Sequence, residues 1–228
     1  MGTISIDLRE MLLGEGASLI GYAEMGPVYE ACRDWPYGVS IAVALNHDIA
    51  AQIENGPTPA YYAAYERING ELARLCGLCV DFLKNRGYRA STMPPTIRGS
   101  GDTAPIPHKT AATRSGLGWI GKSALLVTRE YGPAIRLGTV LTDAPLDTGS
   151  PFIESSCGDC MECRNACPGQ AIRGVNWRAG CAREDIYDAD ACRPTARAQA
   201  GQIGVDNTIC GICIGVCPWT KRYIARAQ

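Results

Sequence analysis

The chain carries the run Cys157-Gly-Asp-Cys160-Met-Glu-Cys163-Arg-Asn-Ala-Cys167-Pro168. This spacing, C-x2-C-x2-C-x3-C-P, is typical of bacterial ferredoxins with two clusters, in which the fourth cysteine binds the other cluster. Three thiolates at intervals of three residues allow one tight loop to hold three iron corners of a cubane. The run therefore predicts a ferredoxin-like module that binds two [4Fe–4S] clusters.

A second run, Cys210-x2-Cys213-x3-Cys217-Pro218, lacks one nearby ligand. The missing ligand is Cys192 or Cys181, and we favour Cys192 because the stretch 186–192 begins what looks like a connecting helix. The eight ligands are then divided between two clusters. Cluster one is assigned to Cys157, Cys160, Cys163 and Cys217, and cluster two to Cys167, Cys192, Cys210 and Cys213.

Zinc and disulfides are the alternative explanations for these cysteines. Zinc favours pairs of C-x2-C knuckles, and a third cysteine followed by Cys-Pro departs from that pattern. Disulfides form in oxidising compartments, yet residues 1–13 contain Asp7, Arg9 and Glu10 and no apolar core of a secretory signal. No apolar run reaches the roughly 18 residues of a membrane helix. We therefore expect a metal-binding, cytoplasmic protein without a membrane partner.

Composition divides the chain into two parts. It has 228 residues, 46% of them hydrophobic, and a formal net charge of −1, which is typical of a globular protein and argues against a broad nucleic-acid-binding surface. Nine of the twelve cysteines follow residue 150, after a Pro/Gly/Ser-rich stretch at 144–151. We predict an N-terminal α+β domain at 1–148 and a cysteine-rich domain at 149–228.

Hydrophobic periodicity predicts the elements of the first half. We expect a short helix at 6–13 with Ser5 as its N-cap, a helix at 58–86 closed by Gly87, and strands at 39–45, 88–92, 123–128 and 135–141. The long helix has an apolar stripe at Leu72, Leu75, Cys76, Cys79 and Leu83. Cys76 and Cys79 could form a redox pair, but their place on this stripe favours core packing. Cys32 is unassigned.

The segment 101–122 is rich in glycine at its end, where Gly116, Gly118 and Gly121 precede Lys122. Such glycines indicate either close approach of the backbone to a bulky, anionic ligand or a structural tight turn. The spacing matches neither a Walker A loop nor a dinucleotide fingerprint.

Several motifs together resemble epoxyqueuosine reductase, a cobalamin-dependent iron–sulfur family related to the reductive dehalogenases. They are Asp102-Thr-Ala-Pro105, Ser115-Gly-Leu-Gly-Trp-Ile-Gly-Lys122, Leu137-Gly-Thr-Val-Leu-Thr-Asp143 and both cysteine runs, ending at Trp219. The resemblance implies a nitroreductase-like α+β domain that holds base-off cobalamin, followed by a two-cluster ferredoxin module. An external one-electron donor of the ferredoxin or flavodoxin type would load the clusters.

The resemblance also implies site residues. Asp102 matches the family's proposed proton donor, and burial would have to raise its pKa for it to act near neutral pH. The residues implied near the cobalamin are Asp102, His108, Gly118, Trp119, Gly121, Lys122 and Ser123. From its turn alone, Asp102 could instead cap a helix that starts near Pro107. His108 stands where the family has an acidic residue, so a proton role is open to it, whereas His47 is expected to make a loop hydrogen bond.

Besides His108, the chain departs from the family in two further places. The loop that covers the substrate side of the cobalamin is largely missing between Pro27 and Tyr37, and the C-terminal helical repeats that help to hold tRNA are not expected. A tRNA substrate is therefore in doubt, and we expect a small molecule or a nucleoside. Two alternatives remain: a corrinoid-reducing or electron-transfer protein without its own organic substrate, and a variant with flavin in the pocket.

Overall fold

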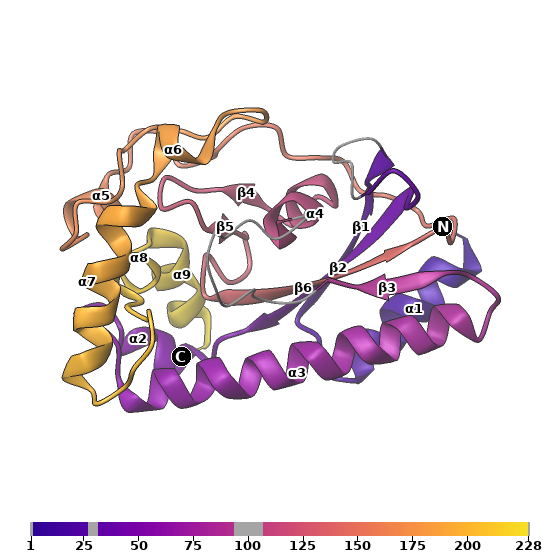
Figure 1. Ribbon diagram of the computed structural model, residues 1–228, viewed down its shortest axis with the longest axis horizontal. Helices are drawn as coiled ribbons and strands as arrows, with labels where there is room; N and C mark the ends of the chain where they lie inside the picture. Colours follow the sequence, from indigo (N-terminus) through magenta and orange to yellow (C-terminus); the bar gives the residue numbers. More distant parts are fainter. Residues whose placement is uncertain (1, 27–31, 94–106, 228) are drawn as a thin grey trace. The chain divides into compact units, whose positions relative to one another are not determined.

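The computed structural model describes residues 2–26, 32–93 and 107–227 (Figure 1). The chain forms two compact units that alternate along the sequence. We call residues 1–43, 68–117 and 136–152 the sheet unit, and residues 44–67, 118–135 and 153–228 the cysteine unit. The cysteine unit thus includes two segments that precede residue 149, namely 44–67 and 118–135. The division into domains at residue 148 stays a prediction.

The sheet unit contains a four-stranded sheet in the order β1-β2-β6-β3 (Figure 1). Its strands are β1 (Leu19–Glu24), β2 (Tyr37–Ala44), β3 (Ala90–Thr92) and β6 (Ile135–Thr142). β1 is antiparallel to β2, with Leu19 opposite Ala42, and β3 is antiparallel to β6. The strands expected at 39–45 and 135–141 are confirmed, whereas β1 was not expected because its residues are buried on both faces and show no alternation.

The long helix α3 (Pro59–Lys84) agrees with the prediction for 58–86. The five residues of its apolar stripe are all buried, and Gly87 ends the helix region with a φ of 86°. Helix α1 (Thr3–Gly14) starts earlier than expected, after Gly2. Ser5 as an N-cap is wrong, because it lies inside the helix and its hydroxyl oxygen accepts the N–H of Asp147.

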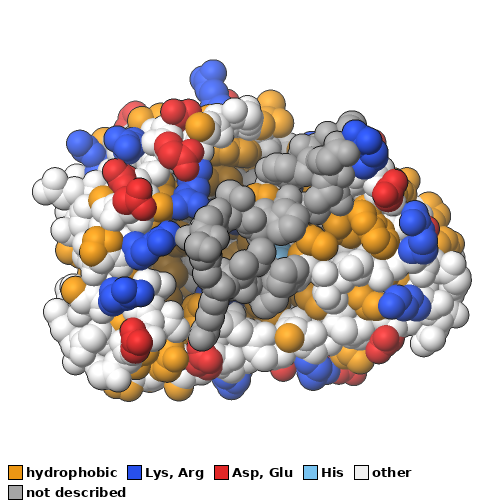
Figure 2. Space-filling model, viewed as in Figure 1, with side chains coloured by type: hydrophobic (Ala, Val, Ile, Leu, Met, Phe, Trp, Pro, Cys, Tyr) orange, Lys and Arg blue, Asp and Glu red, His pale blue; other side chains and the backbone are white. Residues whose placement is uncertain are grey.

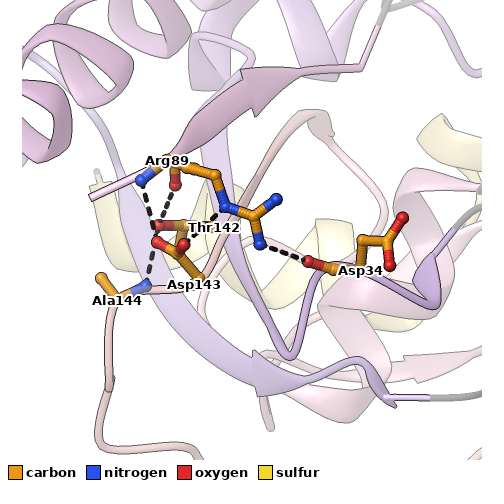
Figure 3. A network of polar contacts seen from close by, with 5 residues as sticks. All are labelled: Asp34, Arg89, Thr142, Asp143 and Ala144. Carbon is orange, nitrogen blue, oxygen red and sulfur yellow. Dashed lines mark hydrogen bonds and ion pairs between the residues drawn. The ribbon is translucent and has the colours of Figure 1, made fainter.

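A polar network joins the residues that precede β3 and follow β6 (Figure 3). Arg89 donates its backbone N–H and its Nε to the two carboxylate oxygens of Asp143, at 2.8 and 2.7 Å. Another guanidinium nitrogen donates to the carbonyl oxygen of Asp34 at 3.1 Å. The Arg89 hydrogen bond is the main reason that the pKa of Asp143 is lowered. The network fixes this edge of the sheet, although Arg89 is exposed and Asp143 is partly exposed.

The cysteine unit consists of short elements. Its strands β4 (Trp119–Ile120) and β5 (Leu126–Val127) form an antiparallel hairpin. Its helices, besides the start of α3, are α2 (His47–Ala51), α5 (Glu162–Asn165), α6 (Arg183–Ile186), α7 (Ala189–Gln202), α8 (Ile212–Gly215) and α9 (Pro218–Ala227). The connecting helix expected to begin within 186–192 is α7, which starts at Ala189. The strand expected at 123–128 is too long, because Ser123 and Ala124 form the hairpin tip and Ala124 has a φ of 57°.

The described surface carries mixed charge. Figure 2 shows Lys and Arg side chains interspersed with Asp and Glu over the face in view, in keeping with a formal net charge of −1. Among the described helices, none combines the length and the apolar character that crossing a membrane requires.

Candidate metal centre

Both cysteine runs fold as a loop followed by a single helical turn. In the first run, Cys163 lies in α5, and the N–H of Cys160 bonds to the carbonyl oxygen of Cys157 at 3.2 Å. In the second run, Cys213 lies in α8, which begins after Gly211 with a φ of 91°. A Cβ at Gly211 would meet Cε1 of Tyr61 at 2.9 Å, so glycine is needed there both for space and for conformation. All nine cysteines of this region are partly exposed.

Two thiols of the cysteine unit, those of Cys163 and Cys217, share Cys157 and Cys160 as neighbours, and we call these four residues the first group. Burial, followed by the thiols of Cys157, Cys217 and Cys160, raises the pKa of Cys163 to about 12. Burial also raises the pKa of Cys217, and among the further causes are the same neighbours, Cys157 and Cys160. These four residues are the ligands predicted for cluster one.

The other predicted ligands form a second group. Burial raises the pKa of Cys210, and the thiols of Cys192 and Cys167 add to the effect. Burial also raises the pKa of Cys213, with Cys210, Cys192 and Cys167 among its neighbours. Cys163 of the first group also contributes to the raised pKa of Cys213, and Cys213 lines the same cavity as that group, so the two groups are not fully separate. Cys181 is not among the neighbours that raise these pKa values.

A cavity of about 250 Å³ lies beside the first group. All four thiols of that group line it, together with Cys213. The hairpin tip contributes Gly121, Lys122 and Ser123, and α9 contributes Trp219 and Arg222. The cavity is therefore bounded by sulfur on one side and by a hairpin tip that carries a lysine on another.

Lys122 connects the hairpin tip to the first cysteine loop. Its ammonium donates hydrogen bonds to the carbonyl oxygens of Gly158, at 2.8 Å, and Cys160, at 3.0 Å. The side-chain amide of Asn176 donates to the same Gly158 oxygen at 3.1 Å. Lys122 is only 4% exposed, so this lysine is part of the wall of the cavity and not a surface charge.

The glycines before Lys122 are close to the protein's own atoms. A Cβ at Gly118 would meet the carbonyl oxygen of Val127 at 2.1 Å, and one at Gly121 would meet Cγ2 of Val127 at 2.8 Å. Of the two explanations that the sequence left open, the tight turn accounts for these two positions. Ser123 is buried at the hairpin tip, and Trp119 is completely buried.

Of the remaining predicted site residues, the structure describes His108, which belongs to the sheet unit. His108 is the first residue of α4 (His108–Arg114), and its Nδ1 lies 2.9 Å from the hydroxyl oxygen of Thr139 on β6. The helix expected near Pro107 is confirmed, with Pro107 itself at the N-cap. Asp102 lies outside the described residues. Its role and those of the other predicted cobalamin contacts stay predictions.

Sequence reasoning missed three side chains around the thiols. Trp219 packs edge-on against Trp119, with ring centroids 5.2 Å apart, and Arg222 lies over the Trp219 ring at 4.7 Å. Burial, followed by the neighbouring Cys192, raises the pKa of Tyr187. The position of Trp219 directly after Cys217-Pro218 was a usable signal, whereas nothing in the local sequence pointed to Tyr187 or Arg222.

A family model described as "4Fe-4S double cluster binding domain" matches residues 156–220. Epoxyqueuosine reductase from Synechocystis sp. is 39% identical over 125 residues, which cover 54% of this chain and 42% of that protein. Tetrachloroethene reductive dehalogenase from Desulfitobacterium hafniense is 28% identical over 229 residues, covering 94% of this chain and 39% of that protein. The chain thus spans about two fifths of the length of these relatives.

Two solved structures share the fold. One is an epoxyqueuosine reductase with an epoxyqueuosine-modified tRNA-Tyr stem loop, with a TM-score of 0.64, 20% identity, and coverage of 95% of this chain and 65% of that one. The other is a reductive dehalogenase described in connection with B12-dependent dehalogenation, with a TM-score of 0.72, 17% identity, and coverage of 96% and 33%. The predicted fold class, α+β with a ferredoxin-like module, is confirmed.

Proposed function

Since the chain is a homologue of the epoxyqueuosine reductases and the reductive dehalogenases, we propose that it is an iron–sulfur oxidoreductase that passes electrons through two [4Fe–4S] clusters to a bound corrinoid. The observation that carries the proposal is the pair of cysteine runs, each of which folds as a loop followed by one helical turn and lies within the residues that the double-cluster family model matches.

The residues around the first group fit a four-iron cluster better than a single metal ion. A zinc ion needs its sulfur ligands to converge at about 2.3 Å from one point, and no three metal-binding side chains among the described residues are placed to hold one ion in that way. A cubane distributes its thiolates over four separate irons. The cavity of about 250 Å³ between the four thiols and the hairpin tip offers a place for it.

The corrinoid part of the proposal rests on the homologues, one of which is described in connection with B12-dependent dehalogenation. A corrinoid would supply a cobalt centre that accepts single electrons and reduces the substrate. Among the described residues, Gly118, Gly121 and Lys122 are engaged by the hairpin and the cysteine loop, so they do not by themselves form an open cradle for a corrin. The flavin alternative has no support from the relatives reported above.

We propose Asp102 as the proton donor. His108 is a second group for this role, because an imidazole gains and loses a proton near neutral pH and the Thr139 hydroxyl orients its ring. The electron donor is an external ferredoxin or flavodoxin. The substrate is a small molecule or a nucleoside, and the tRNA stem loop bound to one relative makes tRNA a further substrate to test. We propose the cytoplasm as the compartment, since the thiols must stay reduced to bind iron.

The proposal is tested on protein that is purified and reconstituted without oxygen. We expect eight irons per chain, and a corrinoid absorption band that stays with the protein after gel filtration with cobalamin. Reduced protein should then turn over epoxyqueuosine, as the nucleoside or within tRNA. Fewer than eight irons, or a flavin band in place of the corrinoid band, would overturn the proposal.

Two further results separate the enzyme from the alternative without an organic substrate. Binding of cobalamin with reduction of an added corrinoid protein, but no turnover of any nucleoside, would favour the electron-transfer alternative. In the enzyme, Asp102→Ala should abolish turnover while the iron content and the corrinoid band are unchanged. Asp102→Glu, which keeps an acid at that position, should retain part of the activity.

A further inference from the structure

Lys122 is a buried cation whose described contacts are all neutral. It is 4% exposed, and its ammonium bonds to the carbonyl oxygens of Gly158 and Cys160 and lies 3.6 Å from the Met161 sulfur. Carbonyl dipoles solvate an ammonium only in part, and an ionised group taken out of water is costly unless an opposite charge accompanies it. The surroundings of Lys122 therefore call for an anion.

The cavity beside Lys122 is the place where that anion belongs. Lys122 lines it together with Cys157, Cys160, Cys163 and Cys217. A four-iron cluster with four thiolate ligands carries net negative charge in every common oxidation state. The same hydrogen bonds fix the carbonyls of the loop from which two of these thiolates come.

We propose that Lys122 is a positioning residue of cluster one, which holds the loop of Cys157 and Cys160 and stabilises the reduced cluster by its charge. This inference rests on the proposed function, and it gives Lys122 a role distinct from the corrin contact expected of it. The electron comes from the external one-electron donor, resides on cluster one in its reduced form and then passes to the acceptor of the proposed function. No covalent bond forms or breaks, and no proton is transferred.

The sign of the effect follows from charge alone. Reduction adds one negative charge to the cluster, so a nearby fixed positive charge favours the reduced form and raises the reduction potential. For a buried unit charge several ångströms away, Coulomb's law at an effective dielectric constant of about 20 gives an effect on the order of tenfold or more in the equilibrium constant. A tenfold change corresponds to about 59 mV for one electron.

The experiment uses the full chain, reconstituted without oxygen and titrated with dithionite while the reduced clusters are followed by electron paramagnetic resonance. Lys122→Gln keeps hydrogen-bond donors but removes the charge, Lys122→Met removes both, and Lys122→Arg keeps the charge. Lys221→Met is the matched control, because Lys221 is half exposed and paired with Glu54 at 2.9 Å. Iron content and thermal stability are measured for each variant.

We expect Lys122→Gln and Lys122→Met to lower the reduction potential of one of the two clusters by about 59 mV, which is a tenfold change in the equilibrium constant for reduction. Loss of the four irons of that cluster in both variants would also support the inference. Lys122→Arg and Lys221→Met should keep eight irons and both potentials. Full iron content with unchanged reduction potentials in Lys122→Gln and Lys122→Met would overturn the inference. So would loss of as much iron in Lys122→Arg as in the two neutral variants, because that result would indicate an effect of packing and not of charge. If the wild-type chain itself binds fewer than eight irons, the proposed function fails first.

Discussion

Cys192 lies in the first turn of α7, where its N–H bonds to the carbonyl oxygen of Asp188 at 3.2 Å. Its thiol is a neighbour of Cys210 and Cys213, whereas Cys181 does not influence either. Cys192→Ala should therefore lose the four irons of one cluster, and Cys181→Ala should keep all eight. Iron and sulfide analysis of the two anaerobically reconstituted variants decides between them, and iron loss only in Cys181→Ala would reverse the assignment.

Cys76 and Cys79 test the redox-pair alternative. Burial raises the pKa of the Cys76 thiol to about 11 and raises that of Cys79 further. A raised thiol pKa favours the neutral form, so at pH 8 only about one Cys76 in a thousand is the reactive thiolate. In native protein at pH 8, iodoacetamide should modify Cys181 well before either residue, as followed by peptide mass spectrometry. A disulfide between Cys76 and Cys79, or alkylation as fast as at Cys181, would support the redox pair.

At the scale of elements, α3 and β6 pack through one tight contact. A Cβ at Gly138 on β6 would meet the Cys76 sulfur at 2.6 Å. Gly138→Ala should therefore destabilise the protein by roughly 1–3 kcal/mol through overpacking. Removing the sulfur in the double variant Cys76→Ala/Gly138→Ala should recover part of that loss, measured as urea midpoints of samples with equal iron content.

Gly70 gives the matched control for that pair, because it is exposed on α3 and a Cβ there would meet nothing within 4 Å. Gly70→Ala should stabilise the helix by roughly 0.5–1 kcal/mol, since glycine is a poor helix former. A double variant no more stable than Gly138→Ala would show that the strain lies elsewhere in the sheet.

Elements with strong periodicity were predictable, and elements set by tertiary contacts were not. The apolar stripe of α3 defines its length and its buried face without reference to any other element. β1 lacks this signal. Its Gly21 is required by tertiary contacts, because a Cβ there would collide with Ser115 and Leu117, which lie more than ninety residues away in the sequence. The ligand cysteines could be read from their spacing, but the contact of Lys122 with Gly158 spans 36 positions and has no local pattern.

At the scale of the whole molecule, the sheet unit and the segment 153–228 have different sources of stability. The sheet unit buries large side chains completely, among them Leu8, Leu12, Ile41 and Leu75. In the segment 153–228, the buried hydrophobic residues are alanines, isoleucines and one valine: Ala171, Ile172, Ile186, Ala196, Ala200, Ile209, Ile212 and Val216. Helices α5 and α8 have four residues each, and isolated helices of that length are unstable in water. Iron must therefore supply part of the folding free energy of this segment.

Removal of iron should consequently loosen one part of the chain and leave the other intact. In hydrogen exchange followed by mass spectrometry, oxidised and chelator-treated protein should lose protection at residues 157–167 and 210–217 by at least about tenfold, because the loops lose their cross-links. Peptides from β2 and from residues 68–84 of α3 should exchange as slowly as in the iron-loaded protein, since their protection comes from apolar packing. Slow exchange in both cysteine loops after complete iron removal would mean that the module folds without metal, and global loss of protection would mean that the sheet unit depends on the clusters as well.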